Sequence, residues 1–231
     1  MMDMNSLLLV DFYKVHHYKM YPKQMSLLYS NFTPRKSRMP SINKVVVFGI
    51  QYAIKEYLID HFNRNFFLNP IREFGINHNY VQAKKKIMFE HYKRITGITD
   101  IQHISDLWDL GYLPIKIKAL PEGSRSNMKV PIFTIRSTKK GYGWLVNYLE
   151  TLLSTILWQM MTSITITDHY VNTIIPYVMT TMNCSREVAF SYVQWMIHDF
   201  SMRGLSSVES GITSGMAHLA SGVTGTDTVP A

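Results

Sequence analysis

The sequence predicts a mixed α/β fold, in which an α+β N-terminal domain precedes the opening strands and helices of a β/α barrel or a doubly wound sheet. Two stretches, 45–62 and 78–95, carry apolar residues at helical spacing. Two others, 114–120 and 130–135, alternate apolar and polar residues as strands do. From residue 193 to Gly225 the pattern is strand, loop, helix, loop, which is the unit that opens such sheets and barrels.

The first forty residues predict a short helix, a strand and a basic loop. The apolar run Leu7–Val10 ends at Asp11, a residue suited to cap a helix that begins at Phe12. A strand is expected over 26–32. Residues 33–40 form a basic loop that contains two prolines, a composition typical of loops that hold phosphate groups.

The middle of the chain predicts two helices, two strands and a long helical run. The strands, 114–120 and 130–135, are joined by a polar connection that begins with the turn Pro121-Glu122-Gly123. Residues 141–181 are helical in pattern, with a break expected near 162–165 and a kink or an end at Pro176. This run closes a first domain, residues 1–185, and residues 186–231 begin a second.

The second domain begins with a short apolar run, Val193–Ile197, which predicts a buried parallel strand. A loop at His198 follows, then a helix from about Ser206 to Leu219 and a second loop at Gly225. Side chains at the ends of such strands are where an α/β sheet presents its ligand site.

Composition indicates a folded protein with partners. The chain has 231 residues, 46% hydrophobic and only 17% charged, so apolar surface is available for an interface, most simply with a second copy. The formal charge of +8 is compatible with nucleic acid, an anionic membrane or a phosphorylated substrate. Because no zinc-finger spacing or basic arm with heptads is present, binding to nucleic acid is the weakest of these alternatives.

The cysteine and the longest apolar stretch favour the cytoplasm. Cys184 is the only cysteine, which excludes an intrachain disulfide and favours a reducing compartment. The N-terminus lacks a basic segment before its short apolar run. The stretch 144–166 is interrupted by Asn147, Glu150 and Gln159, which argues against a membrane span.

The loop after residue 197 contains the residues best suited to bind a ligand. A catalytic pair of His198 and Asp199 is disfavoured, because adjacent residues at a strand end point to opposite faces; a buried His198 satisfied by backbone is expected instead. Phe200 and Arg203 offer a π-face and a cation for an aromatic ring and an anion. The alternative, a core phenylalanine and a surface arginine, stays open. Gly222 and Gly225, on the N-terminal side of Asp227, suggest a backbone that approaches a ligand.

The histidines do not predict a metal site. His16, His17, His78, His91 and His103 have no Cys, Asp or Glu at a metal-ligand spacing. No protein-bound zinc is expected.

Several motifs, in order, resemble those of the nicotinamide phosphoribosyltransferases. They extend over essentially the whole chain. The segments that carry the resemblance are Asp11–Pro22, Tyr29–Phe32 with Arg35, Phe48–Tyr52, Leu113–Gly123, His198–Phe200 with Arg203-Gly204, Ser206-Ser207, Ala217–Leu219 and Gly225–Thr228.

The resemblance implies an enzyme of NAD salvage. Members of the family join nicotinamide to phosphoribosyl pyrophosphate and release nicotinamide mononucleotide and pyrophosphate. It also implies a type II phosphoribosyltransferase fold, Mg²⁺ carried with the pyrophosphate, and ATP where phosphorylation of a family histidine is coupled to turnover. The chemical step is displacement at the anomeric carbon through a cationic transition state.

The resemblance further implies a site shared between the subunits of a homodimer. One subunit contributes Asp11, Tyr13 and Arg35, and the other contributes Phe200, Arg203 and Asp227. The pyridine ring is expected to stack between Phe200 and the partner subunit's Tyr13. The two arginines face phosphate oxygens or the ribosyl side of the ring. Asp227 accepts a hydrogen bond from the carboxamide and repels nicotinate, so nicotinamide is favoured.

Two departures from the family qualify this expectation. The family usually has Gly-Tyr where this chain has Ser201-Met202, which changes the loop beside the ring. The family's barrel also continues well past Asp227, so the barrel here is expected to be incomplete and the catalytic residues are expected to lie outside this sequence.

We therefore expect the N-terminal portion of such an enzyme, with little or no activity alone. The alternative is a non-catalytic remnant that binds nicotinamide or pairs with a full-length or C-terminal partner chain. A basic nucleic-acid-binding module is the third hypothesis.

Overall fold

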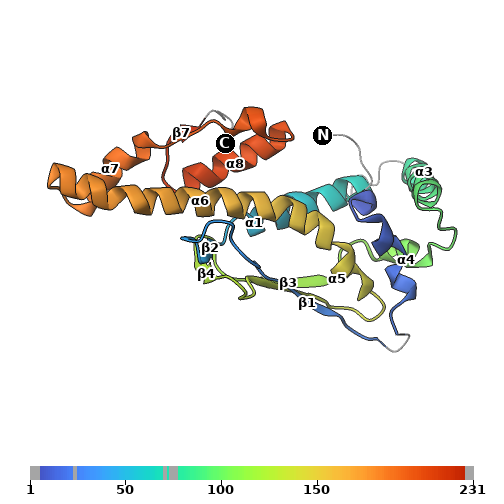
Figure 1. Ribbon diagram of the computed structural model, residues 1–231. Coiled ribbons are helices and arrows are strands. Elements are labelled where there is room, and N and C mark those ends of the chain that lie inside the picture. Colours follow the sequence, from blue (N-terminus) through green and yellow to red (C-terminus); the bar gives the residue numbers. More distant parts are fainter. Residues whose placement is uncertain (1–5, 23–24, 70–71, 73–77, 227–231) are drawn as a thin grey trace. The chain divides into compact units, whose positions relative to one another are not determined.

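The computed structural model describes residues 6–22, 25–69, 72 and 78–226 (Figure 1). The chain divides into two compact units. The first comprises Met1–Asn31, Gln51–Lys118 and Phe133–Ser154, and the second comprises Phe32–Ile50, Ala119–Ile132 and Thr155–Ala231. The chain therefore passes between the two units several times.

The first unit combines a small sheet with several helices. Its strands are β1 (Tyr29–Phe32), β5 (Phe133–Ser137) and β3 (Ile115–Ala119), in the order β1-β5-β3. Its helices are η1 (Ser6–Leu8), η2 (Phe12–Lys19), α1 (Ile50–Tyr52), η3 (Ala53–His61), η4 (Asn63–Phe67), α3 (His78–Thr96), α4 (Gln102–Leu110) and α5 (Trp144–Tyr148). η1 and η2 are 3₁₀-helices, whereas η3 and η4 are wound as π-helices.

A buried pair of tyrosines ties the first unit together. The Tyr92 hydroxyl lies 3.2 Å from that of Tyr148, which donates a 2.6 Å hydrogen bond to the Leu7 carbonyl. Burial raises the pKa of Tyr92 to about 12 and that of Tyr148 further still. Both hydroxyls therefore stay protonated, and they join α3, α5 and η1.

The second unit contains two further strand pairs and three helices. β2 (Lys44–Val46) pairs antiparallel with β4 (Arg125–Asn127), and β6 (His198–Asp199) pairs parallel with β7 (Gly225–Thr226). The helices are α6 (Glu150–Met182, whose first residues belong to the first unit), α7 (Arg186–Met196) and α8 (Val208–Ala220), with the 3₁₀ turn η5 (Ser201–Gly204) before α8.

Most of the predicted elements are present. The helix over 78–95 is α3, the strand over 114–120 is β3, the strand over 26–32 is the shorter β1, and the helix from Ser206 to Leu219 is α8. Residues 33–40 form a loop, as expected. The mixed α/β class is confirmed, and the elements β6, α8 and β7 follow one another in the chain. No barrel is seen in the described part of the chain.

The prediction of a strand over Val193–Ile197 is wrong. Residues up to Met196 belong to α7, which is capped at its start by the Ser185 hydroxyl accepting from the Val188 N–H. Ala189 and Val193 lie four residues apart and are fully buried, so the helical period decides the structure. Only His198 and Asp199 are extended.

The break predicted near 162–165 is also absent, because α6 runs unbroken through it and continues past Pro176 to Met182. The hydroxyls of Thr162 and Thr167 donate to the carbonyls of Trp158 and Ser163, four residues earlier. Hydroxyl residues that bond back to the helix in this way are compatible with its interior.

The helix predicted over 45–62 begins later than expected. Val45 and Val46 belong to β2, and the Val46 N–H donates to Thr165 Oγ1 at 2.9 Å. Gly49, at φ +87°, separates this strand from α1, and a Cβ there would lie 2.6 Å from the Met160 sulfur. The strand predicted over 130–135 is displaced to Phe133–Ser137, and β4 lies in the segment expected to be a polar connection.

The predicted domain boundary after residue 185 stays a prediction. The two units group residues by spatial contact, and each is assembled from separated segments. Among the described helices, none is both long enough and apolar enough to cross a membrane.

Candidate functional site

The candidate site is the loop that leaves β6 and enters α8, which we call the site loop (residues 199–204). Asp199 is 4% exposed, and its Oδ1 accepts the N–H of Ser201 at 2.9 Å. This bond bends the chain at Phe200 and begins the turn η5. Phe200 itself is 66% exposed, and Arg203 is also exposed. The loop therefore presents the predicted ring and the predicted cation to solvent.

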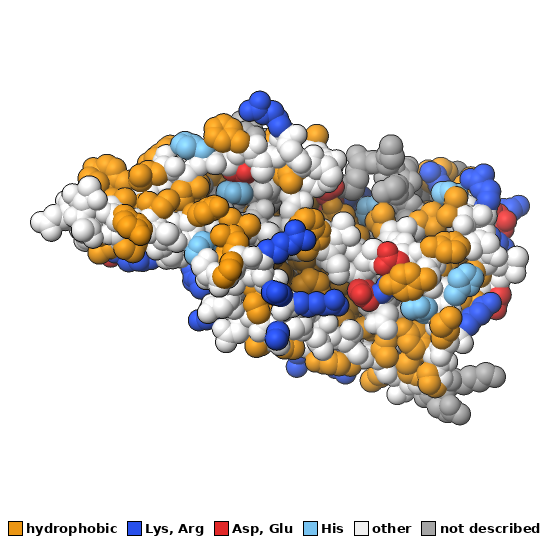
Figure 2. All heavy atoms as spheres, viewed as in Figure 1, with side chains coloured by type: hydrophobic (Ala, Val, Ile, Leu, Met, Phe, Trp, Pro, Cys, Tyr) orange, Lys and Arg blue, Asp and Glu red, His pale blue; other side chains and the backbone are white. Residues whose placement is uncertain are grey.

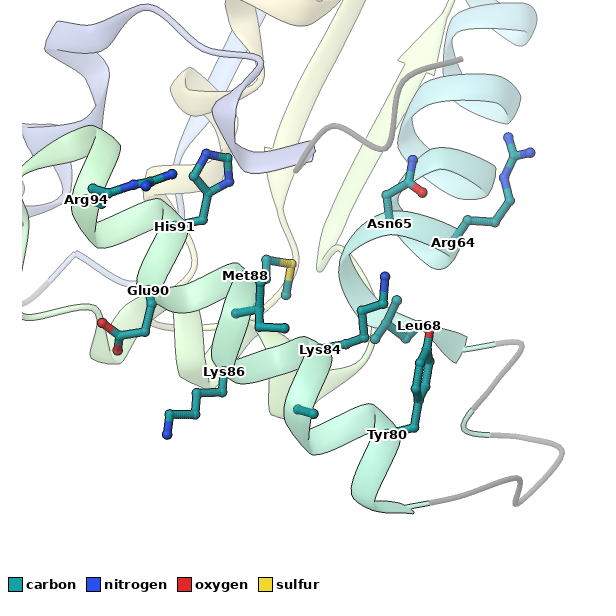
Figure 3. A pocket seen from close by; sticks show the side chains of 12 residues that line it. Arg64, Asn65, Leu68, Tyr80, Lys84, Lys86, Met88, Glu90, His91 and Arg94 are labelled. Atoms are coloured by element: carbon teal, nitrogen blue, oxygen red, sulfur yellow. The ribbon is translucent and has the colours of Figure 1, made fainter.

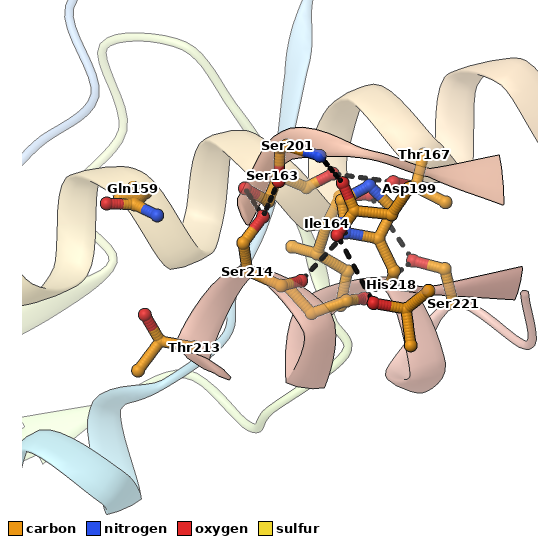
Figure 4. A network of polar contacts seen from close by, with 12 residues as sticks. Gln159, Ser163, Ile164, Thr167, Asp199, Ser201, Thr213, Ser214, His218 and Ser221 are labelled. Atoms are coloured by element: carbon orange, nitrogen blue, oxygen red, sulfur yellow. Dashed lines mark hydrogen bonds and ion pairs between the residues drawn. The ribbon is translucent and has the colours of Figure 1, made fainter. Parts of the chain in front are cut away.

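A network of polar contacts lies beneath the site loop, within the second unit (Figure 4). Asp199 Oδ2 lies 3.3 Å from His218 Nδ1 and 3.5 Å from the Thr226 hydroxyl. The same His218 nitrogen lies 2.7 Å from the Ser214 carbonyl, so it is the Nδ1–H that donates. The buried carboxylate thus joins β6, α8 and β7, and it accepts hydrogen bonds from the Ser201 N–H and the Thr226 hydroxyl.

His198 differs from its prediction because it is exposed. Its ring lies 6.2 Å from that of Phe200 and packs against Gly225 in the neighbouring strand. A Cβ at Gly225 would lie 2.2 Å from His198 Nδ1. The partner of Asp199 is His218, so a pair of His198 and Asp199 is not formed through their side chains.

Gly222 and Gly225 are explained by packing within the chain. Gly222 has φ +81°, and a Cβ there would lie 2.4 Å from the Phe190 ring. Contacts with Phe190 and His198 therefore suffice to exclude a Cβ at these positions, and an approach of their backbone to a ligand stays a prediction.

Asp11 and Tyr13 lie together in the first unit. Asp11 Oδ2 accepts the Thr151 hydroxyl at 2.7 Å, and no side-chain cap of η2 is formed by Asp11. Tyr13 is 57% exposed, with the His17 ring 5.3 Å away and Lys14 Nζ 5.6 Å from its centroid. Lys14 is buried and ion-paired with Glu150, which fixes the first turn of η2.

Arg35 is exposed in the loop that follows β1. The neighbouring Pro34 carbonyl accepts the Lys129 N–H at 2.7 Å, which ties the loop to the second unit. Asp227 lies outside the described residues. The structure thus places Phe200 and Arg203, both exposed, on one loop of the second unit, and Asp11 and Tyr13 at the start of η2 in the first unit. Assembly of the two pairs across a dimer stays a prediction.

Several residues that build the site loop were not predicted as site residues. Ser214 and His218 were missed as supports, although Ala217–Leu219 belongs to the motifs that carry the family resemblance. The signal in the sequence that could have indicated them is the spacing of Gly211, Ser214 and His218, which lie about one helical turn apart on α8.

A large hollow lies elsewhere, between η4 and α3 in the first unit (Figure 3). Its volume is about 1040 Å³, and more cations than anions line it. The lining residues are Arg64, Asn65, Leu68, Tyr80, Ala83, Lys84, Lys86, Ile87, Met88, Glu90, His91 and Arg94. None of the predicted site residues belongs to this groove.

The part of the chain that the structure describes contains no group of three or more His, Cys, Asp or Glu side chains placed to hold a metal ion. The Mg²⁺ expected with pyrophosphate, like ATP, stays a prediction.

Comparison with known proteins shows which enzymes the chain matches. Residues 5–117 match the sequence model of the nicotinamide phosphoribosyltransferase N-terminal domain. The nicotinamide phosphoribosyltransferase of Acinetobacter baylyi is 40% identical over 238 residues, an alignment that covers 98% of this chain and 43% of that protein. This chain corresponds to the N-terminal portion of the nicotinamide phosphoribosyltransferases. The prediction from the motifs is confirmed.

Further matches agree with this family and with the fold. The nicotinamide phosphoribosyltransferase of Mycoplasma genitalium is 29% identical, with 98% of this chain and 50% of that protein covered. The crystal structure of human nicotinic acid phosphoribosyltransferase superposes with a TM-score of 0.56 at 15% identity, covering 96% of this chain and 36% of that one. The chain thus spans half or less of the length of these nicotinamide phosphoribosyltransferase relatives.

Proposed function

We propose that the chain is part of a nicotinamide phosphoribosyltransferase, a pentosyltransferase that makes nicotinamide mononucleotide and pyrophosphate in cytoplasmic NAD salvage. The observation that carries the proposal is the site loop. It presents an exposed Phe200 and Arg203 at the C-terminal end of a parallel strand, in a chain whose sequence corresponds to that family.

The proposed role of the site loop is to bind the pyridine ring. The exposed face of Phe200 stacks on nicotinamide, whose other face is covered by the partner subunit's Tyr13, itself 57% exposed. Arg203 and Arg35, as permanent cations, bind phosphate oxygens. In this proposal β6, α8 and β7 are the opening unit of the family's β/α barrel, which the rest of the enzyme completes.

The structure also offers surfaces for the proposed partners. In the second unit, exposed apolar side chains gather over α7 and the last turns of α6 (Figure 2). They include Tyr177 at 71% and Trp195 at 63% exposure. Exposed aromatic side chains at this density favour a protein interface, with a second copy or with a C-terminal partner chain.

The test is reconstitution of the reaction. The chain is mixed with the separately expressed C-terminal portion of the Acinetobacter baylyi relative, and formation of nicotinamide mononucleotide is measured. We expect product from the mixture and little from either component. Phe200→Ala should raise KM for nicotinamide about tenfold, because the stacked face is lost.

A matched control is Tyr112→Ala, an exposed aromatic residue outside the site loop, which should leave KM unchanged. Absence of product from the mixture, or an equal effect of the two substitutions, would contradict the proposal. Binding of nicotinamide without turnover would favour the non-catalytic alternative.

A further experiment tests the choice between the amide and the acid. Asp227→Asn removes the charge that is proposed to repel nicotinate while keeping a hydrogen-bond acceptor. In the reconstituted enzyme, the preference for nicotinamide over nicotinate, measured as a ratio of kcat/KM, should fall about tenfold or more. An unchanged ratio removes Asp227 from this role.

A further inference from the structure

The site loop lies along one face of α8. Three of its residues contact three helix positions in reverse order: Asp199 contacts His218, Ser201 Oγ lies 3.2 Å from Ser214 Oγ, and Met202 packs on Gly211. At the last contact, a Cβ on residue 211 would lie 2.8 Å from Met202 Cγ, so only glycine leaves room for this side chain.

The three helix positions form a single stripe. Residues 211, 214 and 218 are separated by three and four positions, a spacing that places them on one side of a helix. We call Gly211, Ser214 and His218 the α8 seam. The loop residues that do not contact it in this way, Phe200, Arg203 and Gly204, are the exposed ones.

We propose that the α8 seam is a positioning device, which holds the site loop so that Phe200 and Arg203 face the substrate. The inference rests on the proposed function for the identity of that substrate, nicotinamide and its phosphoribosyl donor. The helix α8 is 13 residues long and is itself fixed to α6. A loop that is attached along one face of such a helix is held by a rigid element. The fixing contacts run from the Gln159 amide to the Ser210 carbonyl, from the Ser221 hydroxyl to the Ile164 carbonyl, and between the Ser163 and Ser214 hydroxyls, so the loss of the last one leaves the others in place.

The seam also gives residues 201 and 202 of the site loop a defined role. Glycine at position 201 could not supply the hydroxyl that reaches Ser214, and Met202 occupies the space above Gly211. In this chain, two side chains of the loop itself therefore provide its attachment to the helix.

Limited proteolysis measures this attachment directly. Arg203 is the only lysine or arginine after Arg186, so cleavage by trypsin after Arg203 releases one C-terminal peptide of defined mass. Proteases cut segments that detach from the fold, and the rate follows the detached population when detachment is rapid. The wild-type chain should be cut slowly at this bond.

Two substitutions in the seam should accelerate cleavage after Arg203. Gly211→Ala displaces Met202, and Ser214→Ala removes the contact with Ser201. Each should raise the cleavage rate about tenfold, which corresponds to the free energy of about one lost hydrogen bond or packing contact. Gly211→Ala should leave the resistance of the whole chain to urea unchanged or higher, since alanine favours helix. This combination separates a detached loop from general destabilisation.

The matched control is Ser163→Ala. It removes the other hydroxyl partner of Ser214, 3.2 Å away on α6, and leaves the Ser201 contact in place, so the cut should keep its wild-type rate. Wild-type rates in both seam variants, or equal acceleration by Ser163→Ala, would overturn the proposal.

Kinetics in the reconstituted enzyme test the positioning role itself. Gly211→Ala should raise KM for nicotinamide about tenfold with a smaller change in kcat, because the ring slot is loosened while the reacting groups remain. If Gly211→Ala accelerates cleavage after Arg203 but leaves KM for nicotinamide unchanged, the seam does not position the substrate-binding residues. A wild-type mixture that makes no product contradicts the proposed function, whereas the cleavage rates still decide whether the seam holds the loop.

Discussion

At two positions near the end of the described chain, side chains of the same protein leave room for glycine alone. Gly222 combines a positive φ of 81° with a space closed by Phe190, and Gly225 lies under the ring of His198. Both were candidates for ligand contact on the basis of sequence. The presence of a glycine in a sequence does not show whether a ligand or a side chain of the same protein lies against it, because both leave no room for a Cβ.

Substitution of Gly222 by alanine should therefore be more costly than backbone strain alone. We expect Gly222→Ala to lower the free energy of unfolding by about 3 kcal/mol, combining the positive φ with the collision at Phe190. Gly123→Ala, at φ +78° with nothing within 4 Å, should lower it by about 1 kcal/mol. Urea denaturation of both variants measures the difference, and equal losses would contradict a steric role for Phe190.

His103 makes stability depend on pH. Its ring stacks on Tyr18 at 3.7 Å and meets the edge of Trp144, and within the described chain neither ring nitrogen has a hydrogen-bond partner. Burial lowers the pKa of His103 to about 4, against its ordinary value of 6.5. Below pH 6.5 the unfolded chain binds a proton that the folded chain does not, so stability is lost as pH falls toward 4.

The expected loss between pH 7 and pH 5 is about 2 kcal/mol for wild type. His103→Phe keeps the stacked ring and removes the titrating group, so the variant should lose less over this range. A residual slope is expected from His61, whose pKa is lowered by burial and by Arg64. Urea denaturation at both pH values gives the comparison, and identical slopes would exclude His103.

At the level of single residues, the sequence predicted the site loop but not its supports. Phe200 and Arg203 could be chosen because a ring and a cation follow an apolar run. The exposure of His198 and the pairing of Asp199 with His218 could not, since His198 lies against Gly225 of β7 and the partner of Asp199 lies nineteen residues later in the chain.

At the level of elements, the wrong predictions arose where a short stretch of sequence was judged without the helical period of the residues around it. The run 193–197 is apolar enough for a strand, yet Ala189 and Val193 belong to one buried helical face that begins at Ser185. In α6, the threonines that suggested a break bond back to carbonyls of the preceding turn. Long amphipathic segments such as α3, by contrast, were placed within one residue of their observed ends.

The start of α8 offers a direct test of helix capping. The Ser207 hydroxyl accepts the Ser210 N–H at 3.1 Å, whereas the adjacent Ser206 contacts only a side chain, at 3.4 Å. Ser207→Ala should lower the free energy of unfolding by about 1 kcal/mol, and Ser206→Ala by much less. Thermal or urea unfolding distinguishes them, and a larger loss at Ser206 would show that the cap lies elsewhere.

At the scale of the whole molecule, the sequence predicted the α/β class, the family and a surface rich in apolar groups. The assembly of each unit from separated segments was not predicted, because contacts such as β2 with β4 join residues about eighty positions apart. Such pairings leave no local pattern.

The exposed apolar side chains of the second unit predict self-association. Tyr177 and Trp195 are both more than 60% exposed, and Trp195→Lys should weaken the dimer by about tenfold or more in Kd. Sedimentation velocity over a range of concentrations measures this. Ile87→Lys, at a site 67% exposed in the first unit, serves as the control, and a chain that is monomeric throughout contradicts the prediction.

The fit of Met202 over Gly211 has a consequence for engineering. Replacement of Ser201 and Met202 by another dipeptide, such as Gly-Tyr, without a change in α8 would remove the methionine that fills the space over Gly211. The loop and the facing residues of α8 form one transplantable module, so a chimaera between relatives should exchange residues 199–220 as a block.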